Sequence, residues 1–536
     1  MSRPAPRRCL AGILALAAGA ALPVAAQQTR AERTGFAETS SVADVAAFLD
    51  SLAPRTPDLR LARLGTSTEG RIVPLVVASR PLVADAGEAH RSGKPIVYLQ
   101  ADIHAGEVEG KEALQALLRD LTTGALRPLL DSLVLLVVPV YNPDGNEAWA
   151  AGEVNRPGQD GPARVGRRAN GQGLDLNRDY VKQEAPETRA AAALLAAWDP
   201  DLLVDLHTTN GSYHGYALTW SPGLNPNEGP ANRLVRERLL PEVQRRMRDR
   251  HGLETFAYGN FRNQEPDSLV QGWETYEGTP RYGTNWYALR GRMAVLSEAY
   301  SNDDFGARVR ATGAFVREVL GWVAEHAAEV KAANRADDRD RPDSLAVRLA
   351  LAPPTEMEVI AEITRAAGDG SHGFAHRERT GTFRRIRMPV FDRFAATRRE
   401  AIPAGYLVPP GFPDVAELLG RHGIAVERLA AHWRGEWEGF TVDSLVPARG
   451  AFEGHRGVRV EGRWRAREGE AGPGWFWVAT DQPRGLLAAW LLEPASEDGL
   501  LTWNFFDRGL RLRGEAPVRR VRGWPGVARE LVGGGE

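Results

Sequence analysis

Histidine and glutamate residues stand in this sequence where they could bind a catalytic metal ion. His104 and Glu107 occur in the stretch Ile-His-Ala-Gly-Glu at 103–107, and His207 ends Asp-Leu-His at 205–207. Two histidines and one glutamate form an established zinc site for hydrolysis, because they leave one coordination position open for water. A His-x-x-Glu pattern alone arises by chance in many proteins, and the plain alternative is a surface histidine beside a helix-capping glutamate. The metal interpretation therefore depends on the rest of the sequence.

The elements that must position these residues alternate between strand and helix. Short apolar runs predict strands at 72–79, 95–101, 133–141, 202–206 and 293–296. Helical patterns occur between them and after them, including leucines spaced i, i+3, i+4 and i+7 from Leu114 to Leu121, an Ala/Leu-rich run at 187–198 and an amphipathic stretch at 308–330. This alternation predicts an α/β domain with a mostly parallel sheet. The candidate residues follow the predicted strands, at the sheet edge where α/β proteins build their sites.

Further motifs appear in a fixed order along the same region. They are Gly-Thr-Ser-Thr-Glu-Gly-Arg at 65–71, Asn-Pro-Asp-Gly at 142–145, Gly-Leu-Asp-Leu-Asn-Arg at 173–178 and Leu-Ser-Glu at 296–298. Together with the two histidine motifs, they resemble the zinc carboxypeptidase family typified by carboxypeptidase A, over about residues 40–325. The resemblance implies a three-layer α/β/α domain with a mixed, mostly parallel sheet. It also implies a zinc metallocarboxypeptidase, a hydrolase of peptide bonds that removes C-terminal residues with a zinc-activated water.

The same resemblance assigns a metal centre and a base. His104, Glu107 and His207 would bind one zinc ion per chain, and Asp175 would accept a hydrogen bond from His104 and fix its tautomer. Glu298 would take a proton from the attacking water and pass it to the leaving amine. An aspartate in the position of Asp175 could equally be an ordinary turn cap.

The resemblance also assigns residues that would contact the substrate. Asn177 and Arg178 would bind the terminal carboxylate, and Arg168 would polarise the scissile carbonyl, with Arg167 as a close competitor. Tyr276 lies at the spacing before Glu298 where the family has a mobile tyrosine. Tyr282 competes for that role, and ordinary packing would explain either tyrosine.

One residue departs from the family pattern. The family usually continues Asn-Arg-Asn, whereas this chain has Asp179 after Arg178. A carboxylate there could pair with Arg178 or repel a substrate carboxylate. This keeps open a zinc amidase or cell-wall peptide hydrolase on the same fold. A binding protein without activity would need a broken site, and every expected position is filled.

Composition limits the setting in which the protein works. Arg3, Arg7 and Arg8 precede an apolar stretch and small residues up to Ala26, which predicts a signal peptide at 1–26 and a secreted or periplasmic protein. The single cysteine, Cys9, lies within it, so the mature chain would have neither disulfides nor a cysteine-bound metal. The net charge of −2 does not favour nucleic acid as a partner, and no later stretch is long and apolar enough to span a membrane.

The chain is too long for one compact domain. We predict a catalytic domain at 27–331, a charged linker at 332–348 and a β-rich accessory domain at 349–536, where short β-like runs are broken by Gly and Pro. The expected partner of the catalytic domain is a peptide or protein substrate.

Overall fold

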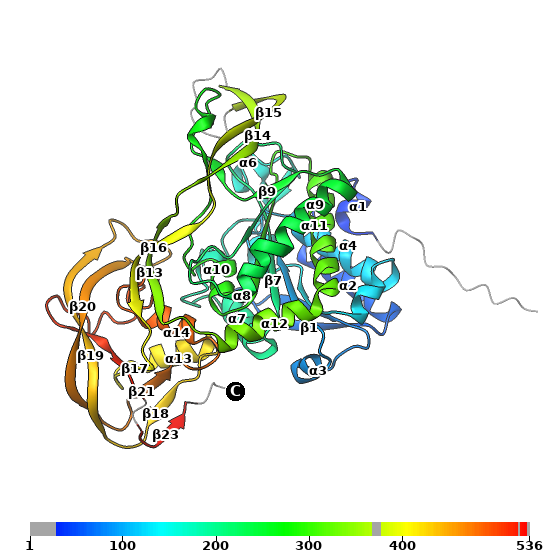
Figure 1. The fold of residues 1–536 in the computed structure, drawn as a ribbon. Coiled ribbons are helices and arrows are strands. Elements are labelled where there is room, and N and C mark those ends of the chain that lie inside the picture. Colours follow the sequence, from blue (N-terminus) through cyan, green and yellow to red (C-terminus); the bar gives the residue numbers. More distant parts are fainter. Residues whose placement is uncertain (1–27, 367–376, 524–525, 533–536) are drawn as a thin grey trace, which may run out of the picture.

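An eight-stranded mixed sheet forms the centre of the first part of the structure (Figure 1). The computed structural model describes residues 28–366, 377–523 and 526–532, so the predicted signal peptide lies outside the described residues. The strands of this sheet are β1 (Leu59–Thr66), β2 (Ile72–Ala78), β3 (Ile96–Ala101), β4 (Val134–Val138), β7 (Leu202–Thr208), β8 (Leu218–Pro222), β9 (Thr255–Ala257) and β12 (Met293–Ala299). Their order is β1-β2-β4-β3-β7-β12-β8-β9, and the central strands β4, β3, β7 and β12 are parallel.

Helices cover both faces of this sheet, as the alternation of buried residues along the strands requires. Val97 and Leu99 of β3 face one helical layer, and Ile96 and Tyr98 face the other. The first layer contains α2 (Val42–Leu52), α4 (Glu109–Thr123), α8 (Pro230–Leu234), α9 (Leu240–His251), α11 (Phe305–Glu325) and α12 (Ala327–Arg339). The second contains α3 (Ala86–Arg91), α7 (Pro186–Trp198) and α10 (Gly283–Leu289). The predicted three-layer α/β/α fold is confirmed.

Two stretches differ from the sequence-based expectation. The predicted helix at 308–330 is divided into α11 and α12 at His326, whose ring stacks on Trp322 with centroids 4.2 Å apart. The segment 332–348, which we predicted to be a linker, contains the second half of α12 and the beginning of β13 (Ser344–Leu351). Its charged residues are explained by a helix with an exposed face, since only Val330 and Asn334 of α12 are buried.

A β-rich region follows, as predicted. Its largest sheet has the order β20-β19-β22-β17-β21-β18-β23. These strands are β17 (Gly405–Val408), β18 (Glu427–Leu429), β19 (Trp433–Pro447), β20 (Val458–Ala471), β21 (Phe476–Ala479), β22 (Glu515–Val521) and β23 (Arg529–Leu531), and the helices α13 (Pro413–Arg421) and α14 (Gly485–Leu492) accompany them. A separate pair joins β13 to β16 (Phe394–Ala401).

One long hairpin of the later region returns to the first region, which is named the catalytic region below after the catalytic domain predicted at 27–331. Strands β14 (Thr355–Ala366) and β15 (Arg377–Phe391) project at the top of Figure 1. There β15 pairs in parallel with β11 (Trp273–Glu274), which pairs with β10 (Asn260–Phe261). The predicted boundary near residue 349 is therefore crossed by a sheet that both parts of the chain build.

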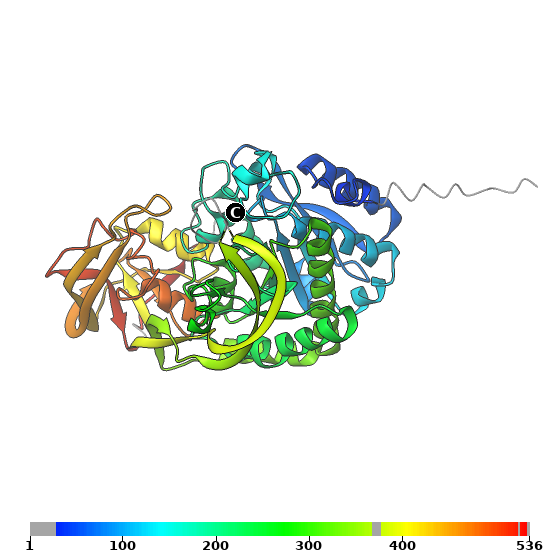
Figure 2. The same cartoon turned by 90° about the horizontal axis from the view of Figure 1, so that it is seen from above.

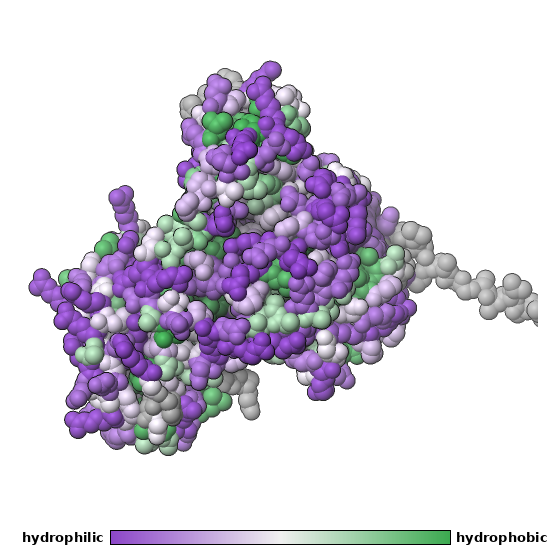
Figure 3. Space-filling view, in the orientation of Figure 1, coloured by the Kyte–Doolittle hydropathy of each residue, from purple (hydrophilic) through white to green (hydrophobic). Residues whose placement is uncertain are grey.

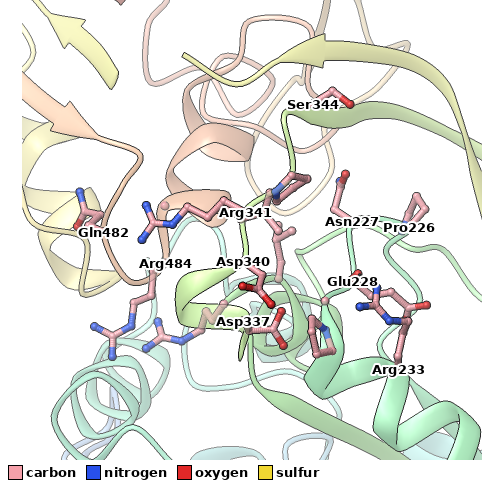
Figure 4. Close-up of a pocket in the computed structure, with 18 of the residues that line it drawn as sticks. Pro226, Asn227, Glu228, Arg233, Asp337, Asp340, Arg341, Ser344, Gln482 and Arg484 are labelled. Atoms are coloured by element: carbon pink, nitrogen blue, oxygen red, sulfur yellow. Dashed lines mark hydrogen bonds between the residues drawn. The ribbon is translucent and has the colours of Figure 1, made fainter. Parts of the chain in front are cut away.

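The catalytic and C-terminal regions lie side by side (Figures 1 and 2) and share one continuous apolar core. It joins Trp286 and Leu195 of the catalytic region to Leu418 and Trp490 of the C-terminal region. A cavity of about 370 Å³ also lies between the two regions, with Asp337 and Asp340 between Arg233 and Arg484 in Figure 4. The C-terminal region is thus docked on the catalytic region over an extensive surface.

The face drawn in Figure 3 is largely hydrophilic, with apolar side chains in small separate patches. Among the described residues, no helix has both the length and the apolar character that crossing a membrane requires.

Candidate metal centre and substrate site

Three side chains converge as a metal site requires. His104 Nδ1 lies 3.2 Å from His207 Nδ1 and 3.2 Å from Glu107 Oε1, and His207 Nδ1 lies 3.0 Å from Glu107 Oε2. Zinc at about 2.0–2.1 Å from tetrahedral ligands separates neighbouring ligand atoms by about 3.3 Å. The three residues are buried, and their ligand atoms all lie within 4.8 Å of one another. The donor set and its spacing fit a zinc ion.

Carboxylates hold the outer nitrogen of each histidine. His104 Nε2 is 2.9 Å from Asp175 Oδ1, as predicted from the resemblance. His207 Nε2 is 3.0 Å from Asp205 Oδ2, a contact that we did not predict. The hydrogen bond to Asp175 fixes the tautomer of His104, so that its Nδ1 keeps a lone pair for a metal. The Asp205 carboxylate lies at ion-pair distance behind His207 and favours the same tautomer there.

Glu107 is held from several sides. The backbone N–H of Thr208 donates to its Oε2 at 3.1 Å, while the guanidinium groups of Arg156 and Arg168 lie 3.1 and 3.4 Å from its Oε1. Burial raises the pKa of Glu107, but Arg156 and His104 outweigh this and hold the pKa well below its usual range. Glu107 is therefore anionic, as a metal ligand must be.

The parallel sheet explains why these residues meet. His104 and Glu107 follow β3 in a turn, closed by the Glu107 N–H donating to the His104 carbonyl at 2.8 Å, just before α4 begins. His207 lies near the end of β7, and Glu298 lies directly opposite it on β12. Carboxyl ends of parallel strands meet at one edge, which brings ligands and base together across 194 residues (298 minus 104).

Glu298 is buried at 9 % exposure beside the candidate ligands. Its carboxylate has no hydrogen bond or ion pair among residues 28–366, 377–523 and 526–532. Arg292, an arginine close to Glu298 in the sequence, does not pair with it and contacts Asp199 at 2.6 Å and Asp338 at 2.9 Å. Burial raises the pKa of Glu298 to about 8, while His207 lowers it and Glu107 raises it. A divalent cation nearby would lower the pKa of the Glu298 carboxyl toward neutrality, and a general base works best when its pKa is near neutral.

The Asn-Pro-Asp-Gly motif positions Arg168. Gly145 permits close approach, since a Cβ there would lie 2.5 Å from the carbonyl oxygen of Arg167. Asn142 caps α5 (Pro143–Glu147) and donates to the Arg168 carbonyl at 3.2 Å. Asp144 accepts hydrogen bonds from Ser67 Oγ at 2.6 Å and from the Glu69 N–H at 2.9 Å, which connects the 65–71 motif to the same loop.

The structure distinguishes the two arginine candidates. Arg168 donates from Nε and Nη2 to Asp175 Oδ2 at 2.9 and 2.8 Å, and its guanidinium faces Glu107. Arg167 is exposed and donates to the Asn170 carbonyl. Burial raises the pKa of Asp175, but His104, Arg168 and Arg178 outweigh it and hold the pKa far below its usual range.

The candidate substrate-binding residues are held by a tyrosine-bearing segment. The Arg178 guanidinium lies 4.1 Å from the centroid of the Tyr282 ring. Asn177 Oδ1 accepts a hydrogen bond from the Gly283 N–H at 2.9 Å. The Tyr276 hydroxyl is 3.1 Å from Thr284 Oγ1, and the rings of Tyr276 and Tyr282 meet edge to face with centroids 5.0 Å apart. Both tyrosine candidates therefore face the site.

Asp179 does not face the substrate site. It is 1 % exposed and accepts hydrogen bonds from the backbone N–H groups of Glu184 and Ala185 at 3.0 and 2.8 Å. Lys182 Nζ lies 3.6 Å from it. The expected pairing of Asp179 with Arg178, or repulsion of a substrate carboxylate, is not observed because the carboxylate closes the following turn.

One cavity of about 110 Å³ collects the predicted residues. Its lining includes His104, Glu107, Arg168, Asn177, Arg178, His207, Tyr276, Tyr282 and Glu298. Of the residues assigned from the sequence, Asp175 lies behind His104, and Arg167 is not part of the lining. The cavity thus combines a cluster that could hold a metal ion, the Glu298 carboxylate and arginine donors.

Comparison with known proteins agrees with this geometry. The model of the zinc carboxypeptidase family matches residues 45–314, which is half of the chain. The chain belongs to the zinc carboxypeptidase family. The members of this family are zinc-dependent hydrolases that act on peptide bonds, so the predicted family and enzyme class are confirmed.

Individual relatives have modest identity to this zinc carboxypeptidase family member. Carboxypeptidase 2 of Trichophyton rubrum is 24 % identical over 463 residues, covering 82 % of this chain and 78 % of its own length. Carboxypeptidase D of Rattus norvegicus is 26 % identical over 271 residues, covering 45 % of this chain and 19 % of its own. A solved metallo-carboxypeptidase from Pseudomonas aeruginosa has 19 % identity and a TM-score of 0.39, covering 55 % of this chain and 70 % of its own.

Two residues of this carboxypeptidase site were missed in the sequence. Asp205 had a signal, because it stands two positions before His207 on a strand, where side chains i and i+2 share a face. No sequence signal pointed to Arg156, because it lies in a loop after α6 (Gly152–Asn155) and reaches Glu107 only in the folded structure.

Replacing Asp205 by asparagine should weaken metal binding without abolishing it. The carboxylate behind His207 would be lost, and such outer partners typically contribute about 10- to 100-fold to metal affinity. A zinc titration against a competing chelator would measure the change, with Asp267→Asn, at an exposed aspartate, as the matched control. Unchanged zinc affinity in Asp205→Asn would contradict the role assigned to Asp205.

Proposed function

We propose that this protein is an exported metallocarboxypeptidase that removes residues from the free C-terminus of peptides. The observation that carries the proposal is the single cavity in which the His-Glu-His cluster, Glu298 and Arg178 face one another. Export is supported by the basic, apolar and small-residue order at 1–26.

His104, Glu107 and His207 would hold one zinc ion per chain. Zinc bound there would polarise a substrate carbonyl and lower the pKa of water. The chain's own residues supply the rest. Glu298 accepts the proton of the attacking water on its carboxylate and then delivers it to the leaving amine nitrogen.

Arg168 and Arg178 bind different parts of the substrate because they lie on different sides of the cavity. Arg168 lies beside Glu107, where its guanidinium can donate to the carbonyl oxygen as negative charge develops on it. Arg178 and Asn177 lie on the tyrosine side of the cavity and bind the terminal carboxylate. Tyr276 and Tyr282 line the part of the cavity that the removed C-terminal residue would occupy.

The alternative of an amidase or cell-wall peptide hydrolase rested on Asp179. Its carboxylate is enclosed in the turn at 182–185 and does not pair with Arg178, whose nearest carboxylate is Asp175 Oδ2 at 3.9 Å. This favours the carboxypeptidase over the amidase. A binding protein without activity is disfavoured by the complete set of side chains around the cavity.

Replacing Arg178 by alanine tests the substrate polarity. Loss of a charged hydrogen bond to the terminal carboxylate should raise KM for free-acid peptides about 10- to 100-fold, and leave amidated peptides little changed. Steady-state kinetics on matched free-acid and amidated peptides would measure this. Arg167→Ala, at the exposed neighbour that donates to Asn170, should behave as the unaltered enzyme. Equal turnover of both peptide types by the unaltered enzyme would instead favour an amidase or endopeptidase.

A further inference from the structure

Two segments form the wall of the cavity at which we place the substrate carboxylate. One runs from Asp175 to Lys182 and carries Asn177 and Arg178; the other runs from Tyr276 to Thr284 and carries Tyr282. They meet through the Arg178–Tyr282 stack and the hydrogen bond from Gly283 to Asn177. The position of the Arg178 guanidinium therefore depends on where both segments lie.

The C-terminal region holds the tyrosine segment through Asp498. This residue follows α14, is 1 % exposed and accepts a hydrogen bond on Oδ2 from the backbone N–H of Arg281 at 2.7 Å. Its Oδ1 lies 3.0 Å from Arg281 Nε and accepts from the Trp503 indole N–H at 2.8 Å. Arg281 immediately precedes Tyr282. Asp498 thus fixes the main chain one residue before the ring that stacks on Arg178.

The same region holds the arginine segment through Glu453. Glu453 Oε2 accepts a hydrogen bond from the backbone N–H of Asp175 at 3.0 Å. Two further contacts lie close by: His455 Nε2 is 2.8 Å from Glu184 Oε1, and Lys182 Nζ lies 4.5 Å from the centroid of the Trp503 ring. Asp175 directly precedes the turn that carries Asn177 and Arg178.

Backbone conformation sets these two carboxylates apart from ordinary surface contacts. Asp498 has φ +66° and Glu453 has φ +48°, in the left-handed region that non-glycine residues seldom adopt. Such conformations persist where the surroundings impose them, and they cluster at functional sites. At both positions the side chain that this backbone presents reaches a backbone N–H beside the cavity.

We propose that Asp498 and Glu453 are positioning residues for substrate binding, so that the C-terminal region completes the carboxylate site of the catalytic region. The inference rests on the proposed function, in which Arg178 binds the terminal carboxylate. It assigns a role to a part of the chain that lies beyond the family match at 45–314. Neither residue touches the substrate; each acts through the segment that it holds.

Kinetics on variants of the full-length enzyme test this role. Asp498→Ala and Glu453→Ala should each raise KM for a free-acid peptide by about 10-fold or more, since small misplacements of binding groups cost up to about 100-fold. For Asp498→Ala, kcat and zinc content should stay within about 2-fold, because Asp498 contacts neither Glu298 nor the metal ligands. Glu453 holds Asp175, which lies behind His104, so the KM of Glu453→Ala is compared at full zinc occupancy. Asp498→Asn should restore most of the affinity, since asparagine tolerates a left-handed backbone and keeps an oxygen for the Arg281 N–H. Asp507→Ala removes an exposed aspartate of the same region that accepts from Asn504, and it serves as the matched control.

A double-mutant cycle separates positioning from general stability. In the Arg178→Ala background, Asp498→Ala should cause little further rise in KM, because its effect passes through Arg178. Melting temperatures of all variants would be measured in parallel. Glu453 lies on a partly exposed loop. If Asp498→Ala does not fold, the same double-mutant cycle can therefore be measured with Glu453→Ala.

The outcomes are distinguishable. A raised KM in Arg178→Ala, with wild-type KM in Asp498→Ala and Glu453→Ala, would overturn the positioning role alone. Fully additive effects in the cycle would overturn it as well, since they mean that the residues act independently of Arg178. Wild-type KM in Arg178→Ala itself would overturn the carboxylate site of the proposed function, and the present inference with it.

Discussion

Replacing Glu298 by glutamine should lower kcat by about 100- to 10,000-fold while zinc content and KM stay nearly unchanged. Glutamine keeps the size of the side chain and one acceptor oxygen, but it cannot accept a proton at neutral pH. Glu298 lies on β12, whereas the three candidate ligands follow or end β3 and β7. Removing its charge should therefore affect the proton transfer and leave the metal in place.

Measuring zinc content and kcat on this one variant separates three readings of Glu298. If Glu298 were a fourth metal ligand, zinc would be lost together with activity. If it were only a structural residue, kcat would change little, and a retained wild-type kcat would remove the mechanism proposed here. Glu274→Gln provides a matched control, because Glu274 pairs with Arg262 and is not part of the cavity lining.

The sequence was informative about the metal centre because the relevant geometry is simple. Polar residues that follow buried parallel strands meet at one edge of the sheet, which favoured a site near His104, Glu107, His207 and Glu298. The roles of these residues came from the resemblance to the zinc carboxypeptidase family. The choice of Arg168 over Arg167 followed from the position along the chain, and of these two arginines the structure places Arg168 against Glu107.

What the sequence could not predict depends on contacts between distant segments. Glu453 reaches Asp175 across 278 residues, and Arg156 reaches Glu107 from an irregular loop. The parallel pairing of Trp273 with Val390 across the expected domain boundary has no local signature either. The concern over Asp179 arose because sequence order placed it beside Arg178, whereas its side chain turns the other way to close the 182–185 turn.

Replacing His207 by alanine should abolish both stoichiometric zinc and activity. His207 contributes one of three ligand atoms, and its Nδ1 is the atom that approaches both His104 and Glu107. With one imidazole gone, only two protein ligands remain, fewer than the three that catalytic zinc sites use. Metal analysis of the dialysed protein should find about one zinc per chain in the unaltered enzyme and little in the variant.

The loss in His207→Ala should be local, which makes its interpretation clear. Asp205 would lose its partner, but the strand register of β7 with β3 and β12 does not depend on the imidazole. Far-ultraviolet circular dichroism should therefore match that of the unaltered enzyme, and His90→Ala, at an exposed histidine on α3, should retain full zinc and activity. Chelator treatment of the unaltered enzyme should reproduce the loss of activity, with recovery on adding zinc back, whereas His207→Ala should not recover. Full zinc occupancy in a folded His207→Ala variant would show that other residues hold the metal. It would contradict the assignment of His104, Glu107 and His207 as the zinc ligands.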